Sequence, residues 1–357
     1  MKIHLISETE FGVKGMGIHT AFKDLVDLIV EKNQHEVIIN NNGHGDVFHA
    51  HTYGLYYFFK GLRYGGRKIH TVHTIPETLN GSVPYFKFIE PFAKMYFKWV
   101  FDFADICVAI SPEVEASLIK LGIKKSKIVS INNPILLDKW AFSSSNRKLG
   151  RAILNIGANE KVVLGVGQMQ KRKGIEDFID IAKLMPEVKF VWIGGRPFGA
   201  FTEGINRINQ RILSAPSNVI FPGLMDLDIM PQIYASADAF AFPSYQENCP
   251  LAPIEAAASG LPVIFRNLPE YKKLYQNDYL NASDTIGFKT ILEKLLGSKT
   301  EMETGKSISK SLISQFDKDQ IYIKLTKIYY LLAQKKAKNR WSRKNRLKNF
   351  KSALHFE

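Results

Sequence analysis

Cysteine is scarce in this sequence, and its scarcity excludes a fold held together by disulfide bonds. Only Cys107 and Cys249 occur in 357 residues, so we expect reduced thiols and a cytoplasmic protein. The sequence also lacks any apolar run near the ~20 residues that span a bilayer. Its first residues, MKIHLISE, lack the long apolar core of a signal peptide. We therefore expect a chain that does not cross a membrane.

Positive charge is what the sequence has in excess. The 48 Lys and Arg residues outnumber the 34 Asp and Glu residues, which gives a formal net charge of +14. Nucleic acid, an anionic lipid surface and a phosphorylated substrate are the acidic partners that fit. Part of the excess is local, because residues 335–351, KKAKNRWSRKNRLKNFK, contain nine basic residues and no acid. This stretch is either a solvated tail or an anchor on an acidic surface.

Apolar, strand-like runs alternate with helical stretches along most of the chain. MKIHLIS, EVIINN, DVFHAH, KIHTVHT, ICVAIS and KIVSINN come first, and KVVLGVG, KFVWIGG, NVIFPGL, AFAFPS and PVIFRN follow a polar link at 142–158. Such alternation predicts parallel sheets with crossover helices. We expect an α/β protein with two doubly wound, Rossmann-like domains, 1–145 and 146–333, and a basic tail at 334–357. The loops beyond the carboxyl ends of the strands are then the candidate site.

Two of these loops have features of a phosphate site. In TEFGVKGMGIHTAF, Gly15 and Gly17 precede a helix, where backbone N–H groups can approach a phosphate, although a plain strand-to-helix turn explains them equally. In VLGVGQMQKRKGIEDF, a buried strand ends at Gly167, and a loop with Arg172 and Lys173 follows. Adjacent cations repel one another unless an anion neutralises them. The second loop therefore favours phosphate over a merely solvated surface.

A third strand-loop-helix unit, FPSYQENCPLAPIEAAASGLPVIF at 242–265, holds two acids separated by seven residues. Glu247 lies in the loop, and Glu255 lies in the helix that follows. A carboxylate that faces the cleft can accept hydrogen bonds from the two vicinal hydroxyls of a ribose. The loop acid lies nearer the place of a sugar. Backbone N–H groups of Asn248 to Leu251, except at Pro250, can donate to that sugar.

Together these motifs resemble the retaining glycosyltransferases of the large family four, which have the two-domain GT-B fold. The resemblance covers about residues 1–333, and its most specific element is the Glu, seven residues, Glu motif of Glu247 and Glu255. The glycine loop KGMG, the strand ends HAHT, TVHT and AISP, and the cationic loop GQMQKRKG support it.

The resemblance implies a role for each matched residue. Glu255 would hold the nucleotide ribose, Glu247 the donor sugar and Lys173 the donor diphosphate, while His73 would lie near the transferred sugar. The implied catalytic residues are His73, Lys173 and Glu247. The implied donor site comprises Gly15, Gly17, Ser111, Gly167, Arg172, Lys173, Gly195, Glu247, Asn248, Cys249, Leu251 and Glu255.

Two positions depart from the family pattern. Gln168 stands where the family usually has Arg, and Arg172 is the candidate to supply that charge instead. Cys249 and Pro250 stand where many members have Phe-Gly. The identity of the donor sugar, glucose or galactose, therefore stays open.

No metal and no other cofactor is expected. Asp226 and Asp228 in MDLDIM look like the Asp-x-Asp of metal-dependent transferases, but we expect a surface turn there. His49 and His51 in FHAHT have a metal-like spacing without an evident third ligand, so we expect structural or substrate-positioning roles. No residue stands out as a covalent nucleophile. The family resemblance implies a same-face displacement with retention.

The stretch VPYFKFIEPFAKMYFKWVF at 83–101 interleaves aromatic and basic residues. On a helix its aromatic residues share one face, and Lys87, Lys94 and Lys98 lie along another. Such a helix suits the headgroup boundary of an anionic membrane, and we expect the three lysines and Trp99 to bind there. An ordinary helix packed on the core is the alternative. Residues 53–68, YGLYYFFKGLRYGGRK, are a second candidate of similar composition.

Two further stretches of the sequence narrow the range of possible acceptors. KGMGIHTAF and HTVHTIPETLNGS are similar to bacterial glycosyltransferases that add a second hexose to monoglycosyl-diacylglycerol. This resemblance implies a UDP-sugar donor, a lipid acceptor and a peripheral place on the cytoplasmic face of the plasma membrane. Transfer to a polyprenyl-linked or soluble saccharide during polysaccharide assembly is the alternative. A nucleic-acid partner is not expected, because the basic residues form no recognisable binding module.

Overall fold

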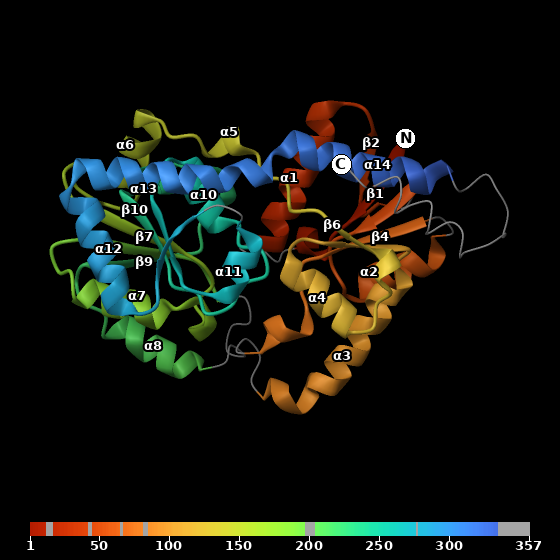
Figure 1. Cartoon of the computed structure of the whole chain (residues 1–357), viewed down its shortest axis with the longest axis horizontal. Helices are drawn as coiled ribbons and strands as arrows, with labels where there is room; N and C mark the ends of the chain where they lie inside the picture. The colour runs from red at the N-terminus through yellow and green to blue at the C-terminus, as the bar shows by residue number, and fades with distance from the viewer. Residues whose placement is uncertain are drawn as a thin grey trace.

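The computed structural model describes residues 1–11, 17–41, 45–64, 67–80, 85–196, 204–275 and 278–334. They form two units side by side, each built on a six-stranded parallel sheet (Figure 1). Gly15 and the basic tail lie outside the described residues. Within them, no helix has the length and apolar character that crossing a membrane needs.

The first unit contains the sheet β2-β1-β3-β4-β5-β6, in which every neighbouring pair is parallel. Its β3 and β5 are buried along their whole length, as expected for strands covered on both faces. The strands are β1 (Lys2–Ile6), β2 (Glu36–Ile39), β3 (Val47–Ala50), β4 (Arg67–Val72), β5 (Ile106–Ala109) and β6 (Ile128–Ser130). The helices are η1 (Glu8–Phe11), α1 (Gly17–Lys32), α2 (Leu55–Arg63), η2 (Pro76–Leu79), α3 (Phe86–Phe103), α4 (Pro112–Lys120) and η3 (Lys125–Lys127).

The second unit repeats the design with the sheet β12-β11-β10-β7-β8-β9. The strands are β7 (Val162–Val166), β8 (Lys189–Ile193), β9 (Val219–Gly223), β10 (Ala239–Phe242), β11 (Val263–Arg266) and β12 (Leu280–Ala282). The helices are η4 (Lys171–Lys173), α7 (Ile175–Lys183), α8 (Ile205–Leu213), η6 (Leu227–Ile229), α9 (Met230–Ser236), α10 (Ala252–Ala258), α11 (Pro269–Leu274), α12 (Thr285–Gly297), α13 (Lys299–Leu312) and η7 (Ile313–Phe316). The sequence pattern predicts every strand except β12, which is short and polar.

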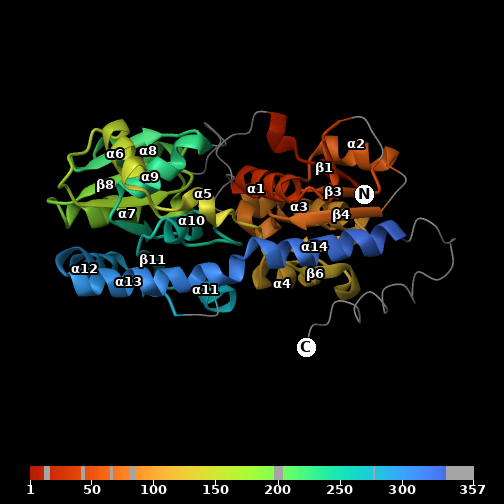
Figure 2. The ribbon, with the colours of Figure 1, turned by 90° about the horizontal axis from the view of Figure 1, so that it is seen from above.

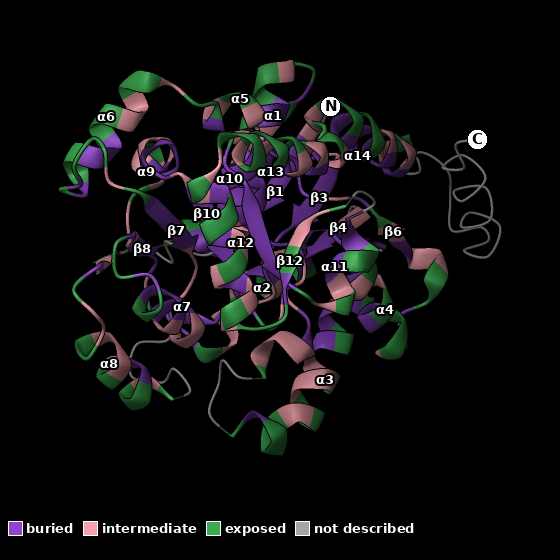
Figure 3. Cartoon of the chain, turned by 60° about the vertical axis from the view of Figure 1, so that its left-hand side comes forward, coloured by how far each residue is buried: buried purple, intermediate pink, exposed green. Residues whose placement is uncertain are grey.

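The core is arranged in layers around the two sheets, and the strands are the most buried part of the molecule (Figure 3). Alternate residues of each strand face opposite layers. In β7, Val163 joins the cluster under α7 and α12, while Val162 and Leu164 join the cluster under α9 and α10. The latter cluster continues into the first unit, where it includes Phe48 and Val72. The doubly wound architecture is confirmed.

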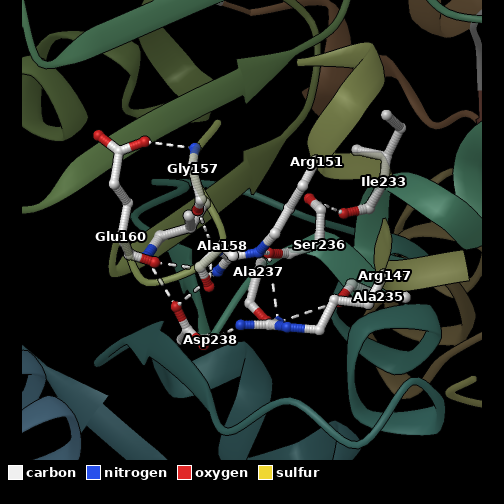
Figure 4. Close-up of polar contacts among 11 residues, drawn as sticks. Arg147, Arg151, Gly157, Ala158, Glu160, Ile233, Ala235, Ser236, Ala237 and Asp238 are labelled. Carbon is white, nitrogen blue, oxygen red and sulfur yellow. Dashed lines mark hydrogen bonds and ion pairs between the residues drawn. The ribbon is translucent and has the colours of Figure 1, made fainter. Parts of the chain in front are cut away.

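The polar link expected at 142–158 contains one helix, α6 (Ser144–Ile153), and α5 (Leu137–Trp140) lies just before the link. Two arginines fasten α6 to the end of α9 (Figure 4). Arg147 donates to the carbonyls of residues 235–237, and Arg151 donates to that of Ser236. Both guanidinium groups also reach Asp238, at 2.7 Å and 3.3 Å. Most of the expected link is therefore an ordered part of the second unit.

The last helix, α14 (Lys318–Ala333), returns to the first unit (Figures 1 and 2). Ile321, Leu325 and Ile328 of α14 belong to the same buried cluster as Ile3 and Leu5 of β1. The range 146–333 expected for the second domain includes this helix, but in space α14 covers the first sheet. Sequence order alone could not show this, because a helix with an apolar face does not identify the sheet that it covers.

Candidate active site

A cleft of about 270 Å³ lies between the two units. It is lined by residues that follow strands of both sheets, as expected for doubly wound domains. Most of the predicted site lies here, namely Gly17, His73, Gly167, Arg172, Lys173, Glu247, Asn248, Cys249, Leu251 and Glu255. The sequence therefore predicts a set of residues that the fold brings together from positions far apart in the chain.

The cationic loop and the loop acid meet in this cleft. Lys173 Nζ lies 2.5 Å from Glu247 Oε1, and Ser244 Oγ donates to the same oxygen at 2.7 Å. Gly174 ends the cationic loop at φ +74°, and a Cβ there would lie 2.2 Å from the carbonyl oxygen of Pro243. Only glycine fits this approach, which keeps the two loops in contact.

Burial lowers the pKa of Lys173 to about 8, although the nearby Glu247 opposes the shift. The ammonium side chain is 14% exposed and has lost most of its water shell. A desolvated cation interacts more strongly with an anion than a surface lysine does, because the local dielectric is low. Lys173 is thus suited to bind a developing negative charge in the cleft.

Arg172 lies beside the position at which the family arginine is missing. Its Nη2 is 3.4 Å from Gln168 Oε1, and its Nε donates to Gln170 Oε1 at 3.0 Å. Both Arg172 and Gln168 line the cleft. This geometry is consistent with the expectation that Arg172 supplies the charge that Gln168 lacks.

Glu255 occupies the first turn of α10 and lines the cleft. Tyr234 of α9 donates a hydrogen bond of 2.6 Å to Glu255 Oε2. Burial raises the pKa of Glu255 to about 7, and the Tyr234 hydrogen bond acts in the opposite direction. No other described residue hydrogen-bonds this carboxylate, so Oε1 can accept from a ligand. Tyr234 is a residue that the sequence reasoning missed, because a tyrosine in the apolar run PQIYASAD carries no motif.

His73 is held from two sides. Its Nε2 lies 3.0 Å from His51 Nδ1, and its carbonyl accepts a 2.9 Å hydrogen bond from Asn248 Nδ2. Burial lowers the pKa of His73 to about 3, so the ring is neutral near pH 7. A neutral imidazole in the cleft can exchange hydrogen bonds with a sugar hydroxyl but carries no charge. Structural or substrate-positioning roles were expected for both His49 and His51, and these stay predictions. His51 contacts His73, and His49 Nδ1 lies 2.6 Å from the Tyr329 hydroxyl.

Two side chains of the Glu247 loop bridge the units. Besides the Asn248 contact with His73, Gln246 Nε2 donates to the carbonyl of Glu77 at 3.0 Å. Asn248 was expected to contribute its backbone N–H to the donor site, and its side-chain contact was not predicted. A contact between residues 175 positions apart in the chain leaves no sequence signal.

Two predicted donor residues, Ser111 and Gly195, do not line the cleft, and a third lies outside the described residues. Ser111 is buried, and its hydroxyl accepts from Val114 N–H to cap α4, next to the cleft residue Ile110. Gly195 does not line the cleft, whereas its neighbour Gly194 does. Gly15 lies outside the described residues. The roles of these three residues stay predictions.

Several further cleft residues were not predicted. They share no motif. They include the polar or aromatic residues Thr20, Tyr53, Thr74, Thr78 and Asn133 of the first unit and the apolar residues Leu224, Met225 and Met230 of the second.

Metal-binding groups of three or more His, Cys, Asp or Glu residues are absent from the described part of the chain. Asp226 and Asp228 are exposed at the turn before α9, as expected.

The helices α2 and α3 carry a large exposed apolar face, here called the α2–α3 face. Phe58 of α2 packs on Trp99 of α3 with ring centroids 4.4 Å apart, so the helices are neighbours. Phe88 and Phe92 are 79% and 69% exposed. The alternative of an ordinary packed helix therefore does not describe this side of α3. The face consists of Leu55, Phe59, Leu62, Tyr85, Phe88, Ile89, Phe92, Met95 and Trp99.

Two lysines of α3 pair with acids of the same helix. Lys94 lies 2.7 Å from Glu90, and Lys98 lies 2.6 Å from Asp102. Lys87 is exposed and makes no ion pair with a described residue. The helix therefore offers less free positive charge than its lysines suggest, and apolar surface is its dominant feature.

Comparison with known proteins identifies the family. The model for "Glycosyltransferase Family 4" matches residues 35–139, and that for "Glycosyl transferases group 1" matches residues 160–297. Alpha-galactosylglucosyldiacylglycerol synthase of Streptococcus pneumoniae is 30% identical over 326 residues, which are 90% of this chain and 87% of the relative. The chain belongs to glycosyltransferase family 4. The family expected from the paired glutamates is confirmed, and the protein is a glycosyltransferase.

A second relative, the processive diacylglycerol alpha-glucosyltransferase of Acholeplasma laidlawii, is 31% identical over 240 residues, which are 66% of this chain and 71% of the relative. Solved structures of low identity share the fold. HepE from Anabaena, in complex with UDP and glucose, gives a TM-score of 0.71 at 17% identity and covers 92% of this chain and 99% of its own. Sucrose-phosphate synthase from Thermosynechococcus elongatus gives 0.72 at 17% identity, with 93% and 99% covered. The GT-B fold is confirmed.

Proposed function

We propose that this family 4 glycosyltransferase moves a hexose from UDP-glucose or UDP-galactose to a monoglycosyl-diacylglycerol, at an anionic membrane surface on the cytoplasmic side. The similarity to a galactosylglucosyldiacylglycerol synthase over 90% of the chain is the observation that carries the acceptor class. The cleft supplies the groups that such a reaction needs from both domains.

The donor would lie across the cleft. In this proposal Glu255 would accept from the ribose, Lys173 and Arg172 would face the diphosphate, and Glu247 would contact the hexose. All four residues line the cleft. Breaking the bond between sugar and phosphate leaves negative charge on the diphosphate, which positioned cations stabilise as it develops. Displacement on the same face retains the anomeric configuration and needs no covalent enzyme nucleophile. No metal is required, because the two basic side chains supply the positive charge.

The α2–α3 face supports the membrane part of the proposal. Soluble proteins rarely expose an apolar patch of this extent without a partner. Its exposed α3 members Phe88, Phe92, Met95 and Trp99 repeat at intervals of three and four residues, so they form one stripe along the helix. Such a stripe inserts at the boundary between headgroups and acyl chains. Lys87 adds attraction to acidic lipid, and the basic stretch at 335–351 is a second candidate for the same surface.

The reaction is tested by product identification. Purified protein is incubated with UDP-glucose or UDP-galactose and with vesicles that contain monoglucosyl-diacylglycerol, and the lipids are analysed by mass spectrometry. We expect a diglycosyl-diacylglycerol from one of the two donors, with or without EDTA. A product formed only on a polyprenyl-linked or soluble saccharide would overturn the acceptor.

Docking is tested by sedimentation with phosphatidylcholine vesicles that contain phosphatidylglycerol. Replacing Phe88, Phe92 and Met95 together by Ser should lower binding by about tenfold or more, since each apolar side chain contributes on the order of 1 kcal/mol when buried. UDP binding should be unchanged. The control replaces the exposed and scattered Leu149, Leu213 and Ile286 by Ser, and it should sediment like the native protein. Equal sedimentation of both variants would refute docking through this face.

A further inference from the structure

Two buried polar groups, Tyr234 of α9 and Asp24 of α1, and the partly buried Lys139 of α5 act on Glu255, the acid proposed to hold the ribose. Tyr234 of α9 donates to Oε2 at 2.6 Å, and its ring packs edge-on against Trp140 of α5 with centroids 5.5 Å apart. Tyr234 is fully buried and its hydroxyl has no second described partner. The phenol group is therefore fixed in place, and it fixes one oxygen of the carboxylate.

The second group is Asp24, which comes from α1 of the first unit. Asp24 is 1% exposed, and no side chain of a described residue hydrogen-bonds its carboxylate. The backbone of Leu136 is close enough to lower its pKa. The helix α1 lies beside α5 and α10 in two views (Figures 2 and 3). Asp24 is close enough to Glu255 for its charge to raise the pKa of that acid. Burial raises the pKa of Asp24 to about 7, while the charge of Lys139 on α5 opposes this.

These groups shift the pKa of Glu255 in opposite directions. Burial itself is the largest cause of its raised pKa; the Tyr234 hydrogen bond and Lys139 lower that pKa, and the charge of Asp24 raises it. A carboxylate must be ionised to accept strong hydrogen bonds from both hydroxyls of a ribose. Nucleotide binding is therefore coupled to loss of the proton from Glu255, and the neighbours decide at which pH this happens.

We propose that Tyr234 is a positioning residue of the nucleotide site, which holds Glu255 oriented and ionised for the ribose, and that Asp24 opposes it from the other domain. This rests on the proposed function, because it takes a UDP-sugar as the ligand of the cleft. Neither residue touches the nucleotide in this arrangement, since neither lines the cleft. Both act through the carboxylate.

The two substitutions should shift nucleotide binding in opposite directions. Tyr234→Phe removes one hydrogen bond from the ionised form, so UDP affinity at pH 7 should fall by about tenfold, and the pH of half-maximal affinity should rise. Asp24→Asn removes a like charge from the surroundings of Glu255. Because the pKa of Asp24 is about 7, this charge is mostly absent at pH 6 and present near and above pH 7. UDP affinity should therefore rise most near pH 7, by up to about twofold, and the pH of half-maximal affinity should fall.

The experiment is calorimetry of UDP binding between pH 5.5 and 8.5. The UDP affinity of each variant is divided by that of the native protein at the same pH, so that the effect of the titration of UDP itself cancels. Tyr271→Phe is the matched control, because Tyr271 is equally buried and its hydroxyl has no partner in the described part of the chain. The ligand control is 2′,3′-dideoxy-UDP, which has no ribose hydroxyls. Tyr234→Phe should not weaken its binding.

The possible outcomes are distinct. The role of Tyr234 is overturned if Tyr234→Phe loses no more UDP affinity than Tyr271→Phe does. It is also overturned if Tyr234→Phe weakens binding of the dideoxy nucleotide as much as binding of UDP. If Tyr234→Phe does not fold, Asp24→Asn still tests the proposal. The proposal is contradicted if the pH of half-maximal UDP affinity in Asp24→Asn stays the same or rises. No binding of UDP to the native protein at any pH would instead refute the UDP donor.

Discussion

Lys173 offers the sharpest test of the chemistry, because its surroundings set both the size and the pH dependence of its effect. We expect Lys173→Ala to lower kcat with UDP-hexose by 10²- to 10³-fold. A lysine about 4 Å from a phosphate oxygen at an effective dielectric of about 20 gives about 4 kcal/mol of attraction. Part of this already exists in the ground state, and the measured cost of removing one such donor is about 3–4 kcal/mol.

The same residue should limit the activity at alkaline pH. Lys173 must be protonated to stabilise the leaving diphosphate, and burial lowers its pKa to about 8. The cation is therefore present below pH 8 and is lost above it. In the native protein kcat/KM should fall tenfold for each pH unit beyond about 8. In Lys173→Ala the residual activity should lack this decline.

Both effects are measured with a coupled assay for released UDP, over pH 6 to 10. The control is Lys171→Ala, because Lys171 lies in the same loop but is exposed and does not line the cleft. It should retain activity within about twofold. The reasoning fails if Lys173→Ala retains more than a tenth of the native kcat, or if Lys171→Ala loses as much.

Three further predictions follow from the described contacts. Arg172→Ala should lower kcat/KM by at least tenfold, whereas Gln168→Arg should be tolerated; steady-state kinetics that show the reverse order would contradict the replacement of the family arginine. Activity should persist in EDTA, and reversible loss that divalent metal restores would refute a metal-free mechanism. The free energy of unfolding, measured by urea denaturation, should fall as pH drops from 6.5 towards 5. The reason is that buried neutral histidines, whose pKa values are lowered from 6.5, take up protons only when the protein unfolds. Two acids with raised pKa values offset part of this effect, so the free energy of unfolding should fall by about 3 kcal/mol per pH unit. A free energy of unfolding that does not change with pH would contradict this prediction. The groups are His49, His51, His70 and His73, opposed by Asp24 and Glu255.

The sequence predicts the two sheets because buried parallel strands are short apolar runs, and eleven of these are visible in the chain. It predicts the cleft because Glu247, Glu255 and Lys173 follow such runs, and the ends of parallel strands meet at one edge. The sequence does not predict β12, because its three residues, LNA, have no apolar pattern.

Contacts between distant segments could not be predicted. The hydrogen bond from Tyr234 to Glu255 depends on how α9 packs beside α10, and the contact of Asn248 with His73 depends on how the domains meet. Periodicity predicts an apolar stripe on α3, yet it cannot tell whether the stripe is covered, because a buried face and a docking face have the same pattern.

The return of α14 to the first sheet also governs when that domain can be completed during synthesis. Ile3 and Leu5 leave the ribosome first, but the helix that covers them, with Ile321, Leu325 and Ile328, is among the last described segments to emerge. Until then α1, with Phe22 and Leu25, covers only part of this cluster, while the second unit already has all its strands. Domains usually fold in the order in which they are made. Here the N-terminal domain is the one that finishes last, and a chain that stops before residue 318 would leave its first sheet incompletely covered however well the rest had folded.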